Sequence, residues 1–393
     1  MLQANRISAW LVSSLAIVIG VETMALAVPP ERYPAAKHGP ASLQTIGGVA
    51  VLTVAGTPAE MGEQTGALGC KAMEPTIRSL MNQFQSKQGF RNAWPKLLIA
   101  ARGMKDQYPL HHLEELEATA KASGLPRDWF FVGNVAGDML KVGEMAQLGA
   151  CSTFVVEPMR SATGGTLLGR NLDIPTIDPI PECTLVIVYR PTGKKAFASI
   201  GFPGLIGVAS GMNESGVAIT INEITSSADG SAKFDPEGTP MVLRIRKLLE
   251  ECASVDEVEK LLKATPRTTM FCLTVADRKT SAIFEITTKH VGRRGAEHAV
   301  NTCTNHFRTS GLSNGGERNC WRYPKLEAAR RGEAKLGLDD VTRALDSVNQ
   351  GRNTVQHMIF EPETLKLHVA LGNGPATQLP RKTVELAPLM KGP

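Results

Sequence analysis

One cysteine in this sequence stands where a side chain could carry out nucleophilic chemistry. In LGACSTFVVEP, residues 148–158, Cys151 follows small residues and precedes an apolar, β-branched run that predicts a buried strand. A thiol at the start of such a strand is most often a core side chain that behaves as a small hydrophobe. The other interpretation is a nucleophile, because a cysteine thiolate attacks carbonyl carbon readily.

Two charged residues near this position favour the nucleophile. The segment GRNLD follows one predicted hairpin later and brings Arg170 and Asp173 to the strand next to Cys151. Burying either charge is costly unless it is paired. A neighbouring cation lowers the pKa of a thiol and raises its thiolate fraction, which would explain Arg170. The alternative is an Arg170–Asp173 ion pair that only stabilises a turn.

The first part of the chain is predicted to be mainly helical. The segment VAVLTVAG at 49–56 alternates like a strand, and the proline-rich, polar residues 28–45 are expected to form a mobile lead-in. Apolar residues then recur with helical spacing through 72–84 and 95–122, so the segment 57–145 is expected to be mainly helical. The first helix begins with TPAE at 57–60, a combination typical of a helix N-terminus.

The second part of the chain changes to short strands. Apolar runs separated by Gly and Pro turns fill 151–223, where the segment RSATGG is interpreted as a long hairpin tip. Two helices are predicted within 239–266, strands return at 269–288, and a helix at 336–349 precedes a hairpin at 356–372. Strands in meanders and helices in pairs predict an α+β fold, with helices covering a sandwich of antiparallel sheets.

Composition argues against several classes of protein. The 393 residues are 42% hydrophobic, enough for a sizeable core, and only 5% are aromatic, with a net charge of +5. Few aromatic side chains and the lack of a Lys/Arg block argue against nucleic-acid binding. The sequence has no GxGxxG motif, phosphate-binding loop, C-x-x-C pair or His-x-x-x-His pair. We therefore expect neither an organic cofactor nor a structural metal ion.

The N-terminus predicts export. One cation, an apolar run, and small residues at Ala25 and Ala27 are typical of a signal peptide over residues 1–27. Glu22 interrupts the apolar run before it reaches the roughly 20 residues that span a membrane, although an uncleaved anchor is the alternative. The mature protein is expected to be secreted or periplasmic, and to contact a membrane only through this segment if it is uncleaved.

Export affects the interpretation of the seven cysteines. An odd number leaves at least one thiol unpaired in an oxidising compartment, while the other six could form three bridges whose pairing the spacing does not reveal. Cys183 and Cys272 lie inside apolar, strand-like runs. These two are expected to be buried, unpaired side chains of the core.

Several motifs resemble a known superfamily. CSTF followed by GRNLD is similar to the cysteine type of N-terminal-nucleophile (Ntn) hydrolases, which include choloylglycine hydrolases, penicillin V acylases and acid ceramidase. Five further segments resemble segments of the acyl-coenzyme A:6-aminopenicillanate acyltransferases, the C45 peptidase family, and occur in the same order. They are VAGTPAEMGEQTG, GMNESGVAITIN, LLKATPRTTMFCLTVAD, TNHF and NCWRYPKLE. This resemblance covers roughly 49–372. It implies a single domain built as a four-layer αββα sandwich, with two antiparallel sheets covered by helices.

The resemblance also implies self-processing. The precursor would cut its own bond between Ala150 and Cys151, and the chains 28–150 and 151–393 would remain associated. The new α-amine of Cys151 would then act as the base for its own thiol. An α-amine titrates near pH 8, so it accepts a proton at neutral pH more readily than a lysine does.

The remaining roles are carried over by position. Arg170 resembles the arginine beside the thiolate, and Asp173 resembles the carboxylate that orients the α-amine. Asn222 in TINEI resembles the amide that donates to the oxyanion. Asn305 in TNHF resembles the second active-site asparagine, and Arg322 in WRYPKLE resembles the late arginine of the network.

Three neighbouring residues limit this assignment. Cys320 stands where a small hydroxyl residue is more usual in the family, and this places the role of Arg322 in doubt. His306 is interpreted as a structural hydrogen-bonding residue, because the mechanism needs no histidine base. Asn213 in GMNESG is interpreted as a turn residue.

The leading hypothesis is an exported hydrolase that cleaves a linear, non-peptide or small-peptide amide of a small N-acyl substrate. Acyl transfer by the same site is the alternative within the family. A second hypothesis is a conventional cysteine hydrolase that uses His306 or His298 without self-cleavage. A third is a non-catalytic exported binding module in which Cys151 is only a core thiol. Specificity is expected in the loops 174–182 and 224–240.

Overall fold

The computed structural model describes residues 32–86, 88–139, 149–174 and 180–392. Arg32–Pro393 form one compact unit. The predicted signal peptide, residues 1–27, lies outside the described residues. The helices of the described part include none that is long and apolar enough to cross a membrane.

The larger sheet of the described residues has ten strands. They follow the order β1 (Ala36–His38), β2 (Ala41–Ile46), β3 (Val49–Gly56), β6 (Leu185–Pro191), β7 (Phe197–Gly201), β8 (Ser210–Asn213), β9 (Ala218–Glu223), β10 (Phe271–Ala276), β11 (Ser281–Ile286) and β12 (Val291–Gly295). Its neighbouring strands are antiparallel except for β3 and β6, which run parallel. The prediction of antiparallel sheets is therefore wrong at this one pair. The chain passes from β3 through the N-terminal helices and then through β4 and β5 of the smaller sheet before it reaches β6, and such a long connection allows parallel pairing.

The smaller sheet has six antiparallel strands in the described residues. They follow the order β13 (Val300–Cys303), β4 (Ala150–Val156), β5 (Leu167–Asp173), β14 (Thr354–Glu361), β15 (Lys366–Leu371) and β16 (Lys382–Glu385). The strand that carries Cys151 begins one residue earlier than expected, at Ala150. The segment RSATGG belongs to the connection between β4 and β5, as predicted.

The two sheets pack face to face, and helices cover their outer faces. Apolar side chains of β3, β6 and β7 meet those of β4, β5, β14 and β15 in a core between the sheets. Helices α6 (Met241–Glu251) and α7 (Val255–Ala264) pack on the larger sheet. Helices α8 (Arg322–Arg330) and α9 (Leu338–Asp346) pack on the smaller sheet. The predicted α+β, four-layer αββα sandwich is therefore confirmed.

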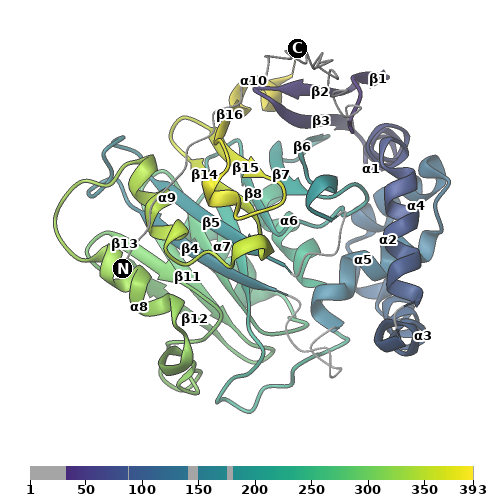
Figure 1. Ribbon diagram of the computed structural model, residues 1–393. Helices are drawn as coiled ribbons and strands as arrows, with labels where there is room; N and C mark the ends of the chain where they lie inside the picture. The colour runs from purple at the N-terminus through teal and green to yellow at the C-terminus, as the bar shows by residue number, and fades with distance from the viewer. Residues whose placement is uncertain (1–31, 87, 140–148, 175–179, 393) are drawn as a thin grey trace, which may run out of the picture. The chain divides into compact units, whose positions relative to one another are not determined.

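A group of N-terminal helices adds a further core beside the sandwich. It contains α1 (Pro58–Gln64), a π-helical continuation over Thr65–Cys70, α2 (Glu74–Ser86), α3 (Gln88–Gly103), α4 (Leu110–Ser123) and α5 (Arg127–Met139). A short helix, α10 (Leu386–Lys391), ends the chain. Figure 1 shows α2–α5 gathered at one side of the sheets, with α8 and α9 at the other. Thr57 and Glu60 form the capping box expected from TPAE.

The structure corrects the prediction of a mobile lead-in at 28–45. Within this range, β1 and β2 form the edge of the larger sheet, and Leu43 is buried. Leu43 and Ala41 alternate with more exposed positions, so the strand buries one face despite its polar composition. Residues 28–31 lie outside the described residues.

All seven cysteines are free thiols, so the possibility of three disulfides is not realised in this structure. Cys183 and Cys272 are buried, as expected.

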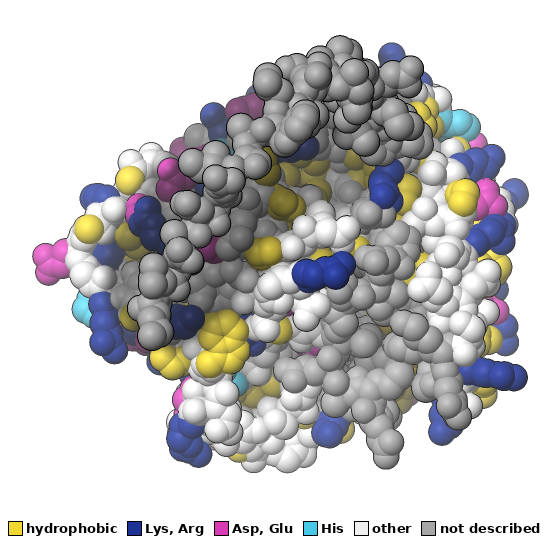
Figure 2. Space-filling view, viewed as in Figure 1, with side chains coloured by type: hydrophobic (Ala, Val, Ile, Leu, Met, Phe, Trp, Pro, Cys, Tyr) yellow, Lys and Arg dark blue, Asp and Glu magenta, His cyan; other side chains and the backbone are white. Residues whose placement is uncertain are grey.

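On the face drawn in Figure 2, Lys and Arg side chains are dispersed among other side chain types.

Candidate active site

Cys151 is the second residue of β4, and antiparallel pairing with β5 determines its surroundings. Ala150 pairs with Asp173, Cys151 with Leu172, and Thr153 with Arg170. The side chain of Cys151 is 5% exposed. GRNLD therefore lies beside the cysteine, as the sequence predicted.

Arg170 is buried and points its guanidinium at the thiol. Its Nη2 lies 3.2 Å from Cys151 Sγ and also donates to the carbonyl oxygen of Ile221 over 2.8 Å. Its Nη1 donates to the carbonyl oxygen of Ala209 over 3.1 Å and to the hydroxyl of Ser210. Burial raises the pKa of the Cys151 thiol, and Arg170 opposes that shift. The arginine is thus positioned to stabilise a thiolate when one forms.

Asp173 does not pair with Arg170, because the two residues are three positions apart and point to opposite faces of β5. One carboxylate oxygen, Oδ1, accepts a hydrogen bond from the hydroxyl of Thr354 over 2.5 Å. The other, Oδ2, is buried and has no hydrogen-bond partner in the described part of the chain. Burial raises the pKa of Asp173 to about 6, against the opposing hydrogen bond from Thr354. This acceptor remains available to a proton donor.

Asn305 and Arg322 hold the backbone of Cys151. Asn305 Oδ1 accepts the backbone N–H of Cys151 over 3.0 Å and a guanidinium N–H of Arg322 over 2.8 Å. Arg322 also donates to the carbonyl oxygen of Cys151 over 2.6 Å and to the hydroxyl of Ser152 over 3.0 Å. Asn305 Nδ2 donates to the carbonyl oxygen of Glu223 over 2.8 Å. Two residues that are far from Cys151 in sequence therefore meet at its main chain.

Asn222 comes from β9 of the larger sheet and faces β4 of the smaller sheet. Its Oδ1 accepts a hydrogen bond from the hydroxyl of Thr153 over 3.0 Å. Its Nδ2 is buried and has no partner among the described residues. An unpaired buried donor costs free energy, and this nitrogen is able to donate a further hydrogen bond.

Asn213 shows the contrasting case. Its amide donates to the carbonyl oxygens of Leu249 and Cys252, and its Oδ1 accepts the backbone N–H groups of Ser215 and Val217. Every polar atom of this side chain is thus engaged. Asn213 is a turn residue, as predicted.

A cavity of about 640 Å³ opens beside the Ala150–Cys151 bond. Its lining includes Gly149, Ala150, Asp173, Ile224, Asn305, His306, Cys320, Trp321 and Arg322. A Cβ at Gly149 would lie 2.7 Å from the carbonyl oxygen of Asp173, so only glycine fits this close approach. Ile174 and Ile224–Ser226 also line the cavity, and they belong to the two loops expected to govern specificity.

Cys320 adds a second thiol to this cavity. Its Sγ donates to Thr304 Oγ1 over 3.5 Å, and Thr304 Oγ1 lies 3.0 Å from His306 Nδ1. Burial disfavours the Cys320 thiolate, but hydrogen bonds with His306, Thr304 and the backbone of Tyr323 outweigh it and lower the pKa to about 6. The unusual cysteine of NCWRY is therefore a half-buried, acidic thiol beside the site.

The two histidines considered as bases lie in different places. His306 lines the cavity and packs edge-on against Tyr323, with ring centroids 5.0 Å apart. Its Nδ1 is engaged with Thr304, in agreement with the predicted structural role. His298 lines a separate cavity with Arg330–Glu333.

The structure brings all six predicted site residues into one region, although their catalytic roles remain predictions. Sequence reasoning missed the side chains that orient them. These are Thr153 for Asn222, Thr354 for Asp173 and Ser210 for Arg170. Only Thr153 had a local signal, because it lies on the same strand face as Cys151, two residues later.

Comparison with known families extends these observations. Residues 160–323 match the model of the family described as acyl-coenzyme A:6-aminopenicillanic acid acyl-transferase. Five of the predicted site residues, Arg170, Asp173, Asn222, Asn305 and Arg322, lie within the match, and Cys151 lies before it. The matched residues are fewer than half of the chain, and for them the resemblance to this branch of the Ntn hydrolases is confirmed.

Curated protein sequences include no significant match. Solved structures with similarity include a Caenorhabditis elegans N-acylethanolamine-hydrolyzing acid amidase ortholog (17% identity, 54% of this chain and 93% of that chain, TM-score 0.45). A mutant form of conjugated bile acid hydrolase from Clostridium perfringens has 16% identity over 60% of this chain and 92% of that chain, with a TM-score of 0.44. A penicillin V acylase from Agrobacterium tumefaciens has 14% identity over 61% of this chain and 93% of that chain, with a TM-score of 0.43.

Proposed function

We propose that this protein is a self-processing Ntn amide hydrolase whose nucleophile is Cys151. The observation that carries the proposal concerns the backbone nitrogen of Cys151. Asn305 accepts its N–H, Arg322 holds the same Asn305 oxygen, and Asp173 presents an unpaired oxygen beside Ala150. Such an arrangement would hold an α-amine at this nitrogen, which a core thiol alone does not require.

Self-cleavage would begin at the Ala150–Cys151 bond. Cys151 Sγ attacks the carbonyl carbon of Ala150, the C–N bond breaks, and the thiol proton is transferred to the departing nitrogen. Water then hydrolyses the thioester, which leaves a carboxylate on Ala150 and restores the thiol. The close packing of Gly149 against Asp173 supports the proposal, since it holds the bond to be cut at the cavity.

Turnover would use the same groups. The new α-amine accepts the thiol proton, and the thiolate, with Arg170 beside it, attacks the amide carbonyl of the substrate. Asn222 Nδ2 donates to the oxyanion, a contribution typically equivalent to roughly 100- to 1,000-fold in rate. The leaving amine takes the proton back from the α-amine. Water then releases the acyl group from Cys151.

The substrate class follows from the size and lining of the cavity. A volume of about 640 Å³ accommodates a small N-acyl compound, and the mixed lining combines Trp321 and Ile224 with asparagine and arginine side chains. We propose a linear amide that is not part of a folded protein. Transfer of the acyl group to an amine instead of water is the alternative, which the match to an acyltransferase family supports.

Export and assembly complete the proposal. Removal of residues 1–27 would give a secreted or periplasmic protein, and cleavage would give chains 28–150 and 151–393. Contacts of α5 with α6, including the Asp138 carboxylate on the backbone N–H of Met241, would keep the two chains associated.

Intact mass spectrometry of the purified protein tests the proposal. The wild type should show two masses, with a boundary at 150/151, that co-elute on a sizing column and separate in denaturant. Cys151→Ala should give one uncut chain. Cys252→Ala is the matched control, since it removes another buried thiol of the same segment and should be cut normally.

A single mass for folded, active wild-type protein would refute self-processing. If such a protein lost activity on replacement of His306, the conventional cysteine hydrolase would be favoured. A folded protein that stays uncut and inactive would favour the binding module. A panel of N-acyl amino acids, acyl-lactones and penicillins, assayed with and without an added primary amine, would separate hydrolysis from acyl transfer.

A further inference from the structure

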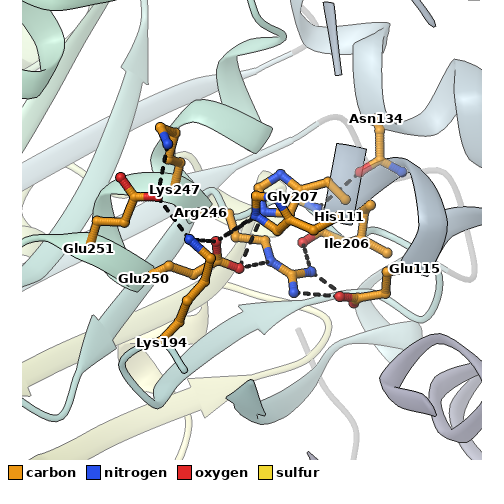
Figure 3. A network of polar contacts seen from close by, with 11 residues as sticks. His111, Glu115, Asn134, Lys194, Ile206, Gly207, Arg246, Lys247, Glu250 and Glu251 are labelled. Atoms are coloured by element: carbon orange, nitrogen blue, oxygen red, sulfur yellow. Dashed lines mark hydrogen bonds and ion pairs between the residues drawn. The ribbon is translucent and has the colours of Figure 1, made fainter. Parts of the chain in front are cut away.

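We propose that His111, His112 and Glu250 form a binding site for one divalent transition-metal ion of the zinc class. Among the described residues, these three side chains form a group whose possible metal-binding atoms all lie within 4.8 Å of one another. The two histidines lie in the first turn of α4, and Glu250 lies near the end of α6. Figure 3 shows His111 and Glu250 facing each other across the space between the two helices.

The spacing of the donor atoms fits a metal ion. Glu250 Oε2 lies 3.1 Å from His111 Nε2 and 3.2 Å from His112 Nε2. Zinc binds imidazole nitrogen and carboxylate oxygen at about 2.0–2.2 Å, so two ligands on a tetrahedral ion lie roughly 3.3–3.5 Å apart. The observed distances are close to this range. Two imidazoles and one carboxylate, with one position left for water, are also a ligand set that zinc accepts.

The surroundings keep Glu250 oriented while leaving one of its oxygens for the ion. Arg246 Nε donates to Glu250 Oε1 over 2.8 Å. His112 Nε2 lies 3.2 Å from both oxygens of Glu250, but Oε2 is the oxygen that lies near both histidines. The rest of the Arg246 guanidinium binds both oxygens of Glu115, over 2.8 and 2.5 Å. A hydrogen bond to the second oxygen of a ligating carboxylate is a common feature of metal sites.

Charge and access are also compatible with an ion. Lys194 Nζ lies 3.9 Å from Glu250 Oε2, but it also pairs with Glu251 at 2.8 Å, outside the ligand group. Glu250 is fully buried, whereas the side chain of His111 is 29% exposed. An ion and a water ligand can therefore enter from the His111 side.

The sequence offered no spacing signal for this site, because the ligands come from segments 138 and 139 residues apart. His111 and His112 precede position 150, and Glu250 follows it. If the chain is cut as proposed, the ion would connect the two products. This consequence rests on the proposed function, whereas the ion site itself does not.

Equilibrium dialysis against Zn²⁺, followed by elemental mass spectrometry, tests the site. Wild type and the uncut Cys151→Ala chain should each retain about one zinc ion per molecule, which separates this test from the question of cleavage. His111→Ala, a change at a partly exposed residue, should weaken Zn²⁺ binding by at least about tenfold. His38→Ala is the matched control, because His38 also lies 3.1 Å from a glutamate, Glu63, but without a second histidine.

Substitution of Co²⁺ gives a second, spectroscopic measurement. Wild type should show the visible absorption of four-coordinate Co²⁺, and His111→Ala should lack it. Equal Zn²⁺ retention by wild type and His111→Ala would place the ion elsewhere and refute the proposal. Lack of stoichiometric Zn²⁺ in both wild type and Cys151→Ala would also refute it, and the cluster would then be a hydrogen-bonded contact between α4 and α6.

Discussion

The hydroxyl of Thr153 lies 3.0 Å from Asn222 Oδ1, and this contact determines which way the Asn222 amide faces. Thr153 belongs to the smaller sheet and Asn222 to the larger sheet, and both side chains are fully buried. Because Thr153 occupies the oxygen of the amide, the nitrogen is directed away from it without a partner among the described residues. The hydrogen bond between the sheets thus orients the proposed oxyanion donor.

Replacing Thr153 with valine should therefore lower turnover without preventing substrate binding. The variant keeps the shape of the side chain but loses the hydroxyl, so the Asn222 amide can rotate. We expect kcat to fall on the order of tenfold, part of the roughly 100- to 1,000-fold effect of losing an oxyanion donor, with KM changed less. Thr153→Ser should retain most activity. Equal losses for Val and Ser would show that packing, not the hydrogen bond, is responsible.

Replacing Gly149 with alanine should slow self-cleavage. The added Cβ would lie 2.7 Å from the Asp173 carbonyl oxygen, so the segment that carries the cleavable bond must shift. Small displacements of reacting groups can cost 100-fold in rate, and we expect a slowing of about tenfold or more. Gly133→Ala is the control, because a Cβ there meets no atom within 4 Å. Cleavage would be followed by gel electrophoresis over time, and equal rates in the two variants would contradict the prediction.

The pH dependence of kcat/KM should respond to Thr354. Burial raises the pKa of Asp173 to about 6, and the hydrogen bond from Thr354 opposes that rise. If the ionised carboxylate is required, activity should be lost as the pH falls through about 6. Thr354→Val removes the opposing hydrogen bond, so the Asp173 pKa rises further and the loss should begin at a higher pH. Thr354→Ser should behave like wild type, and an unchanged profile in Thr354→Val would exclude this role for Asp173.

Cys320 should react with iodoacetamide faster than the other cysteines once Cys151 is replaced by alanine. Hydrogen bonds outweigh burial and lower its pKa to about 6, so its thiolate fraction should rise as the pH increases through that value. Burial instead raises the pKa of Cys70 and Cys252 to about 12 each. Peptide mass spectrometry after brief labelling from pH 5 to 8 would measure this. Preferential labelling of Cys252 or Cys70 would contradict it.

Much of the fold was predictable from local patterns. The capping box at 57–60 and the alternation at 49–56 act through neighbouring residues, so they appear in the sequence as they appear in the structure. The strands β1 and β2 were missed because their polar composition resembled a loop. β1 is exposed, and the one buried face of β2 depends on packing against the rest of the protein, which no local pattern reports.

For the candidate site, the sequence by itself determined which residue types are present and how β4 and β5 pair. One predicted hairpin was enough to bring Arg170 and Asp173 beside Cys151, because antiparallel pairing is a short-range relationship. The resemblance added Asn222, Asn305 and Arg322 by position, without saying what each contacts.

Only the tertiary structure decided how these residues face one another. Asn305 and Arg322 reach the main chain of Cys151 across 154 and 171 residues, and Thr153 reaches Asn222 across the sandwich. The same holds for Cys320, whose acidity depends on Thr304 and His306, and for His111, His112 and Glu250. Hydrogen-bond geometry and burial arise from side chains that meet only when both sheets and their helices are packed, so they are properties of the folded chain.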